Sequence, residues 1–225
     1  MNRRILITGA SRGFGAALGA SLTRRGHRVF AGVRGSHDAP GVAGTPVALD
    51  VTSDESVRAA CATIAAEVAA LDVVVNNAAI RSATVMRPIE EIDFRDVART
   101  LDTNSIGPLR VMKAFLPLLR RGNAPSLVNV SSEAGSLGQC WRDREFDYCM
   151  SKAALNMATV LIAKYLRGAV RVVALHPGWL RTDMGGPNAA LDPVAVADDV
   201  AGLIGEENRW PEHLFVDHEG KPLPW

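Results

Sequence analysis

The chain has 225 residues, of which 48% are hydrophobic and 22% are charged, and its formal net charge is +1. This length suits one sizeable core and is short for two domains. The balanced charge gives no reason to expect a nucleic acid or an anionic membrane surface as a partner. No apolar run reaches the roughly 20 residues of a membrane helix, and the one after Arg4 is too short for a secretion signal. Three cysteines without metal-ligand spacing predict no metal site and a reduced, cytoplasmic protein.

Short apolar runs alternate along the chain with longer segments of helical period. The apolar runs predict strands at residues 5–7, 28–31, 46–49, 72–75, 126–130, 170–175 and 213–216. The periodic segments predict helices at 14–25, 52–68, 88–102, 105–121 and 147–167, and another from Asp192 and Pro193 onward. Thr52 and Glu55 have the spacing of a capping box. The pattern predicts a single-domain, doubly wound α/β fold over residues 1–225, with a parallel sheet covered by helices on both faces.

A glycine-rich turn joins the first predicted strand to the first helix. It reads Thr8-Gly9-Ala10-Ser11-Arg12-Gly13-Phe14-Gly15. Glycines let the backbone approach a pyrophosphate closely, and a helix N-terminus offers free N–H groups with a partial positive charge. The spacing is G-x-x-x-G-x-G and not the common G-x-G-x-x-G fingerprint. Glycines also serve ordinary strand-to-helix turns, so this turn by itself leaves both interpretations open.

The ends of the second and third strands bear on the choice of dinucleotide. Arg34 lies where NAD-binding folds place an acid for the ribose hydroxyls, and no acid occurs between residues 29 and 36. A guanidinium there suits a 2′-phosphate, and Arg12 is a second candidate. The alternative is that both arginines are solvated surface charges. Asp50 and Val51 end the third strand, where the carboxylate either accepts from an adenine amino group or belongs to a plain loop.

Tyr148 and Lys152 are four residues apart on a predicted helix, so their side chains share one face. An ammonium beside a phenol lowers the phenol pKa from about 10 and favours proton exchange with an alcohol. Ser132 ends the fifth strand, where a hydroxyl can bond a substrate oxygen. Asn104 interrupts a helical stretch. Each signal alone has a structural alternative. Tyr148 and Lys152 could be a surface pair on a helix, Ser132 could belong to an ordinary turn, and Asn104 could simply break a helix.

Taken together, these motifs resemble the short-chain dehydrogenase/reductase family over nearly the whole chain. The matching motifs are the turn from Thr8 to Gly15, Asp50-Val51, Asn76-Asn77-Ala78-Ala79, Asn104, Val128-Asn129-Val130-Ser131-Ser132, Tyr148 to Lys152 and His176-Pro177-Gly178. Their order and their places at strand ends make the resemblance specific.

The resemblance implies a role for each matched position. Tyr148 is the implied catalytic acid/base, Lys152 binds the nicotinamide ribose and lowers the tyrosine pKa, and Ser132 polarises the carbonyl. Asn104 is implied to hold a water that links Lys152 to solvent. The implied cofactor is NADP(H), with NAD(H) second. The implied cofactor-binding residues are Gly9, Ser11, Arg12, Gly13, Phe14, Gly15, Arg34, Asp50, Val51, Asn77, Ala78, Ala79, Tyr148, Lys152, Pro177, Gly178 and Thr182.

Two departures from the family pattern point to a subgroup. Ser132 and Tyr148 are separated by a wider gap than most members show, and the chain is short after the sixth strand. With the segments around residues 177–186 and 220–225, these departures resemble C-factor and sniffer-like carbonyl reductases. We expect Trp141, Trp179 and Met184 in the two departing segments to form a substrate wall. The alternative is that the tryptophans pack locally and that the charged run 142–145 is solvated.

The sequence therefore predicts an NADPH-dependent enzyme that reduces an aldehyde or ketone, with a small-molecule substrate. Oxidation of an alcohol by the same residues is a second interpretation. A cofactor-sensing regulatory or signalling protein is a third, although binding alone needs neither Ser132 nor Tyr148. The resemblance also implies a homodimer or homotetramer formed through the helices at 105–121 and 147–167.

Overall fold

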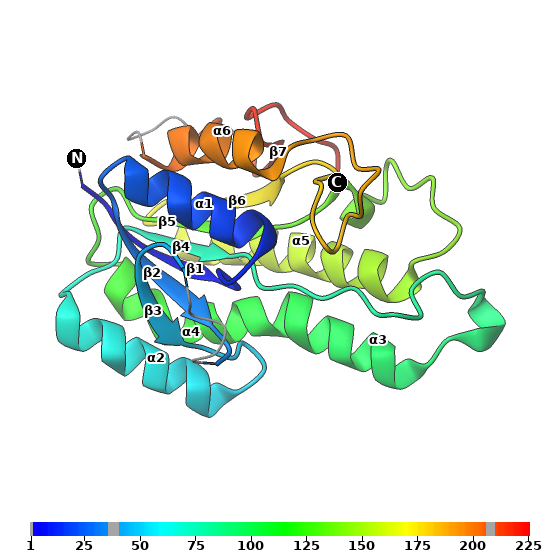
Figure 1. Cartoon of the computed structure of the whole chain (residues 1–225), viewed down its shortest axis with the longest axis horizontal. Helices are drawn as coiled ribbons and strands as arrows, with labels where there is room; N and C mark the ends of the chain where they lie inside the picture. Colours follow the sequence, from blue (N-terminus) through cyan, green and yellow to red (C-terminus); the bar gives the residue numbers. More distant parts are fainter. Residues whose placement is uncertain (1, 36–40, 206–209) are drawn as a thin grey trace.

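The computed structural model describes residues 2–35, 41–205 and 210–225, and it shows a twisted parallel sheet between two layers of helices (Figure 1). Within these residues the sheet has seven strands in the order β3-β2-β1-β4-β5-β6-β7. Every neighbouring pair is parallel. The strands are β1 (Arg4–Thr8), β2 (Arg28–Val33), β3 (Thr45–Ala48), β4 (Val73–Asn76), β5 (Ser126–Val130), β6 (Arg171–His176) and β7 (Phe215–Asp217). The strand order reverses beside β1, as the doubly wound prediction requires.

Helices cover both faces of the sheet because successive strand residues point to opposite sides. Ile5 and Ile7 of β1 pack with α1 (Gly13–Arg24) and α6 (Pro193–Gly205), which lie together above the sheet in Figure 1. Leu6 packs on the other face with α2 (Asp54–Glu67), α4 (Gly107–Leu119) and α5 (Phe146–Leu166). The predicted fold class, with helices on both faces, is confirmed. No helix in the described part of the chain is both long and apolar enough to cross a membrane.

Two helix starts show where the sequence patterns succeed and fail. Asp192 accepts hydrogen bonds from the backbone N–H groups of Val194 and Ala195, at 2.7 and 3.3 Å, so the predicted start of α6 is confirmed. The predicted capping box at Thr52 is wrong. Ser53 caps α2 by accepting from the Ser56 backbone N–H at 3.2 Å, whereas Thr52 donates to Asp50.

The predicted helix at 88–102 is shorter than expected. A 3₁₀ turn at Ile89–Glu91 follows Pro88, and Asp93 then caps α3 (Phe94–Leu101). The early part of the segment satisfied the helical period, but Pro88 and the capping Asp93 hold the backbone extended there. A π-helical turn at Asp102–Ile106 then joins α3 to α4, so the predicted interruption at Asn104 is confirmed.

The segment after β7 returns to the loop that follows β5. Trp225 stacks on Phe215 of β7, with ring centroids 5.1 Å apart. Its backbone oxygen accepts from the backbone N–H of Gly138 at 2.8 Å. These two contacts connect the loop at 137–145 to the edge of the sheet.

Candidate active site

The glycine turn after β1 is packed against the end of β4 through backbone atoms. A Cβ on Gly9 would lie 2.8 Å from the Cα of Ala78, and a Cβ on Gly15 would lie 2.4 Å from Nδ2 of Asn77. Gly9 also has a φ of +65°, which favours glycine. Asn77 Nδ2 donates to the backbone oxygens of Thr8 and Gly9, at 2.9 and 3.0 Å. The structure therefore brings these predicted cofactor residues together, with Asn77 as a brace for the turn.

The N-terminus of α1 opens from this turn without a local cap. Arg12 occupies the capping position and makes no side-chain cap hydrogen bond, and the first helical turn holds no acidic residue. Its N–H groups and partial positive charge are thus suited to an anion. The Phe14 side chain is buried in the core, so this residue can offer a ligand only its backbone.

Arg34 and Asp50 lie near one another at the ends of β2 and β3. Burial raises the pKa of Asp50, but hydrogen bonds from Thr52 and the positive charges of Arg34 and Arg110 outweigh it, so the pKa is lowered overall. Asp50 Oδ1 accepts from Thr52 N and Oγ1 at 2.9 and 2.7 Å. Arg34 is exposed, and Val51 packs against Gly107 at the start of α4.

Asn104 sits in the π-helical turn and joins two segments. Its Oδ1 accepts from the backbone N–H of Ile80 at 2.8 Å, and its Nδ2 donates to the Ile80 oxygen at 2.9 Å and to Ser151 Oγ at 3.0 Å. Ser151 in turn donates to the Tyr148 backbone oxygen at 2.8 Å. The amide therefore fixes the chain beyond β4 against the helix that carries Tyr148.

Ser132, Tyr148 and Lys152 meet at the end of β5. Ser132 lies close enough to the Tyr148 phenol to lower its pKa, and the Lys152 ammonium lies 5.7 Å from the centre of the Tyr148 ring. Lys152 is 2% exposed, and its Nζ donates to the Val130 backbone oxygen at 2.8 Å. Burial lowers the pKa of Lys152 to about 8.

The segment after β6 approaches the glycine turn from the other side of the site. A Cβ on Gly13 would lie 3.6 Å from Cγ2 of Thr182, and Arg12 forms an exposed ion pair with Asp183 at 3.4 Å. Gly178 has a φ of +86°, and a Cβ there would lie 2.3 Å from Cδ1 of Leu191. Thr182 also borders an open hollow of about 400 Å³. The two stretches that the sequence predicted to hold the cofactor therefore lie side by side.

Comparison with known proteins identifies the family. The family model described as short chain dehydrogenase matches residues 3–191. The chain belongs to this family.

Two solved structures cover the whole of this short-chain dehydrogenase. The NADPH-bound carbonyl reductase from chicken fatty liver is 29% identical, with a TM-score of 0.89 and 99% of its own chain covered. The carbonyl reductase Sniffer of D. melanogaster is 28% identical, with a TM-score of 0.90 and all of its chain covered. The C-signal of Myxococcus xanthus is 41% identical over 160 residues, which are 69% of this chain and 93% of the relative.

The pKa of Tyr148 in this dehydrogenase departs from the expectation for a phenol beside an ammonium. Burial raises it above the usual 10, and this outweighs the Ser132 hydrogen bond and the positive charges of Arg81 and Arg142. Lys152 is not among the main influences on this pKa, which is set by burial and by the nearby charges. Its ammonium donates to the Val130 oxygen and lies 5.7 Å from the centre of the Tyr148 ring, and a lowering of the phenol pKa by Lys152 stays a prediction.

The structure contains charged residues beside the site that the sequence patterns missed. Arg142 forms a bidentate ion pair with Glu133, at 2.5 and 2.6 Å, and a second pair with Glu145 at 2.6 Å. Glu145 is also paired with Arg81. The only advance signal was the three-residue spacing of Arg142 and Glu145. The alternative that the run 142–145 is simply solvated is therefore wrong for Arg142, whose side chain is 15% exposed.

The predicted substrate residues lie at the surface. Trp141 is 77% exposed, and its ring lies against the Arg142 guanidinium at 4.4 Å from the ring centre. Trp179 is exposed, and its Nε1 donates to the Gly185 backbone oxygen at 2.8 Å. Met184 is 37% exposed.

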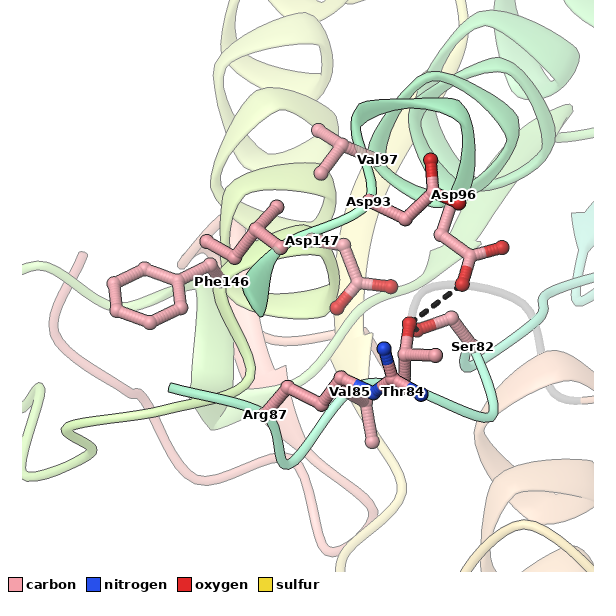
Figure 2. A pocket seen from close by; sticks show the side chains of 10 residues that line it. Ser82, Thr84, Val85, Arg87, Asp93, Asp96, Val97, Phe146 and Asp147 are labelled. Carbon is pink, nitrogen blue, oxygen red and sulfur yellow. Dashed lines mark hydrogen bonds between the residues drawn. The ribbon is translucent and has the colours of Figure 1, made fainter. Parts of the chain in front are cut away.

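A small pocket near the start of α5 holds none of the predicted catalytic side chains. Figure 2 shows Asp147 and Phe146 on one side of it, and Thr84 donating to Asp96 at 2.5 Å on the other. Its volume of about 10 Å³ admits roughly one water molecule. Asp147 is held there by Thr100 at 3.0 Å. The hydrogen bond from Thr100 to Asp147 holds the first turn of α5 in place, next to Tyr148 in the sequence.

Proposed function

We propose that this short-chain dehydrogenase reduces an aldehyde or ketone to an alcohol with NADPH, and that Tyr148 donates the proton. The observation that carries the proposal is the meeting of Ser132, Tyr148 and Lys152 at the same strand ends as the glycine turn. Ligands of doubly wound sheets bind at such ends. A binding protein would have no use for a phenol hydrogen-bonded to a serine.

The residues around the glycine turn fit a dinucleotide. The backbone at Gly9 and Gly15 is so closely packed that added side chains would collide with Ala78 and Asn77 and displace the turn, and α1 presents an uncapped N-terminus. Arg12 and Arg34 are exposed cations beside it, and both suit a 2′-phosphate. We assign NADP(H) on these grounds, in agreement with the NADPH-bound relative. When bound, the nicotinamide supplies the hydride.

In the proposed reaction, the protein positions the carbonyl and delivers a proton. Ser132 holds the substrate oxygen, and Tyr148 gives its hydroxyl proton to the alkoxide that forms there. Lys152, with its pKa near 8, replaces that proton from a water held near Asn104. Asn104 fixes Ile80 and Ser151 and so holds the approach to Lys152 in place.

Exposed aromatic and apolar side chains support a bulky or varied carbonyl as substrate. Trp141, Trp179 and Met184 stand on the two segments that depart from the family pattern. Large apolar groups left at a surface commonly mark a binding site. We propose that they form the substrate wall and that one domain carries both the cofactor and the substrate sites.

Replacement of Tyr148 by phenylalanine tests the proposal. A panel of aldehydes and ketones is assayed with NADPH and with NADH through the absorbance of the reduced nicotinamide. The wild-type protein is expected to favour NADPH, and Y148F to lose on the order of 100-fold or more in kcat while NADPH binding is kept. Equal turnover by both proteins would contradict the assigned role of Tyr148.

Other outcomes of this assay favour the alternative functions. Turnover of alcohols alone would favour a dehydrogenase that works in the oxidative direction. NADPH binding without turnover of any carbonyl or alcohol would favour a signalling role, which the similarity to the C-signal supports.

Apolar side chains on the outer faces of α4 and α5 support a homo-oligomer. The exposed members are Leu109, Met150, Met157, Leu161 and Tyr165, and the exposed Ile106 lies in the π-helical turn directly before α4. We propose that a second copy of the chain covers them, because an apolar surface of this kind is stabilised by burial. Light scattering after size-exclusion chromatography measures the assembly, and the mass of a single chain at micromolar concentration would contradict it.

A further inference from the structure

A chain of ion pairs beside Tyr148 links four separate segments of the protein. Glu133 follows Ser132 at the end of β5, Arg142 belongs to the next loop, Glu145 directly precedes α5, and Arg81 lies beyond β4. The side chains of Arg142 and Glu145 are 15% and 13% exposed. The Arg142–Glu145 pair is therefore screened less by solvent than a surface pair, while Glu133 is 29% exposed and is fixed in direction by its bidentate contact with Arg142.

Backbone contacts hold the same residues in place. The Glu133 N–H donates to Nδ1 of His176 at 3.3 Å, and the Glu145 N–H donates to the Val85 oxygen at 3.0 Å. Glu145 has a φ of +63°, which is uncommon for a residue other than glycine and is maintained only by surrounding contacts. Its two arginine partners and Val85 supply those contacts at the point where the chain enters α5.

We propose that Arg142 is a positioning residue for the reaction: its pairs with Glu133 and Glu145 set the charge around the Tyr148 phenol and hold Trp141 at the substrate opening. This inference rests on the proposed function of Tyr148. Arg142 acts through the residues that it pairs with, Glu133 and Glu145.

The charges that face the phenol come from four segments. Arg81 and Arg142 favour the phenolate, Glu133 opposes it, and Lys152 lies on the same helix. His176 is beside Glu133, and burial lowers its pKa, so this ring is neutral near pH 7. Removal of Arg142 leaves the Glu133 carboxylate uncompensated near the phenol, whereas removal of the Glu133 charge leaves Arg142 with Glu145.

The two partners of one ion pair therefore have opposite effects on the phenol. In R142M the pKa of Tyr148 is expected to rise by about one unit, and in E133Q it is expected to fall by a similar amount. R142K keeps the charge and is expected to restore most of the wild-type value. A purely structural role would predict shifts of the same sign for R142M and E133Q, because both break the same contact.

The ionisation of Tyr148 can be measured without turnover. The chain has two tyrosines, and Tyr165 lies on α5 away from the catalytic residues, on the face proposed for a second copy, where phenylalanine keeps the aromatic ring. In a Y165F background, ultraviolet difference spectroscopy during a pH titration reports Tyr148 alone. The matched control is R144M, which changes an exposed arginine of the same loop and is expected to leave the titration unmoved.

The pH dependence of alcohol oxidation provides a second measurement. In the plot of kcat/KM against pH, the rise that requires the phenolate is expected to shift to higher pH in R142M and to lower pH in E133Q. At a fixed pH on that rise, kcat/KM is expected to change about tenfold. Shifts of one sign in both variants, or no shift in either, would overturn the inference. Absence of turnover in the wild-type protein would instead refute the proposed function, and the spectroscopic titration would still decide the role of Arg142. Circular dichroism identifies a variant that fails to fold, in which case E133Q and R142K decide the question.

Discussion

At the ends of β1 and β4 the site is held together by closely packed backbone and the Asn77 amide, whereas at the ends of β5 and β6 it is held by charged and aromatic side chains. The first region depends on glycines that nothing larger can replace. The second depends on Arg142, its two glutamates and Trp141, which come together from separate parts of the chain. A cofactor shared by a whole family suits a fixed backbone cradle, and a variable substrate suits side chains that can change.

The largest expected effect concerns the backbone region. In G15A the added methyl group meets both Asn77 and the Gly9 oxygen at about 2.5 Å or less. We expect a loss of about 3 kcal/mol in stability and NADPH binding weakened at least tenfold, measured by urea unfolding and by titration of cofactor fluorescence. The control is G202A on α6, where an added Cβ would contact nothing within 4 Å. If G15A binds NADPH as well as G202A does, the cradle is not rigid.

A second prediction concerns Lys152, which belongs to the side-chain region. Its pKa is about 8 in the folded protein against 10.5 ordinarily, so between pH 8 and 10 the unfolded chain binds more protons at this site. Stability contributed by this site therefore rises with pH across that window, by about 2–3 kcal/mol. The raised pKa of Tyr148 acts in the opposite direction only above pH 10.

Urea unfolding at several pH values measures this effect. The wild-type protein is expected to gain stability between pH 8 and 10 relative to K152M. K164M, which changes an exposed lysine on the same helix, is expected to follow the wild type. Parallel curves for wild type and K152M would show that Lys152 is not desolvated as the structure indicates.

A third prediction tests whether Arg34 sets the preference for NADPH over NADH. In R34A the preference for NADPH over NADH is expected to fall by about 2 kcal/mol, roughly thirtyfold, because a charge-assisted contact to the 2′-phosphate is lost. The ratio of kcat/KM values for the two cofactors measures this preference. R58A, an exposed arginine on α2, is the control. An unchanged ratio in R34A would refute the assignment of this residue.

The smallest expected effect concerns the substrate region. W141A removes the ring that lies against Arg142, and we expect KM for an aromatic ketone to rise severalfold, about 1 kcal/mol, with kcat nearly kept. L137A, an exposed residue of the same loop, is the control. A fall in kcat alone would place Trp141 in the support of Tyr148 and not in substrate binding.

The contrast between the two regions also explains what the sequence could predict. The glycine turn and the strand pattern are local, so the fold class and the order of strands and helices along the chain follow from short stretches of sequence. The interruption at Asn104 was visible for the same reason. The start of α3 was not, because Pro88 and Asp93 override a helical period that residues 88–93 also satisfy.

Interactions between distant residues account for the rest. The pairing of Arg81 with Glu145 and of Arg142 with Glu133 joins segments that no sequence pattern connects. The pKa of Tyr148 depends on burial and on those same charges, which the spacing to Lys152 does not reveal. Short motifs can be recognised in the sequence, but the sum of the charges that act on the Tyr148 phenol is known only from the folded structure.

The stacking of Trp225 on Phe215, with the bond from Gly138 to the Trp225 oxygen, has a consequence for protein engineering. A designer who transplants the loop at 137–145 into a related enzyme, to transfer its substrate preference, would leave behind the support that shapes it. Residues 222–225 and the β7 edge should therefore be exchanged together with that loop, as one module made of two separate pieces of chain.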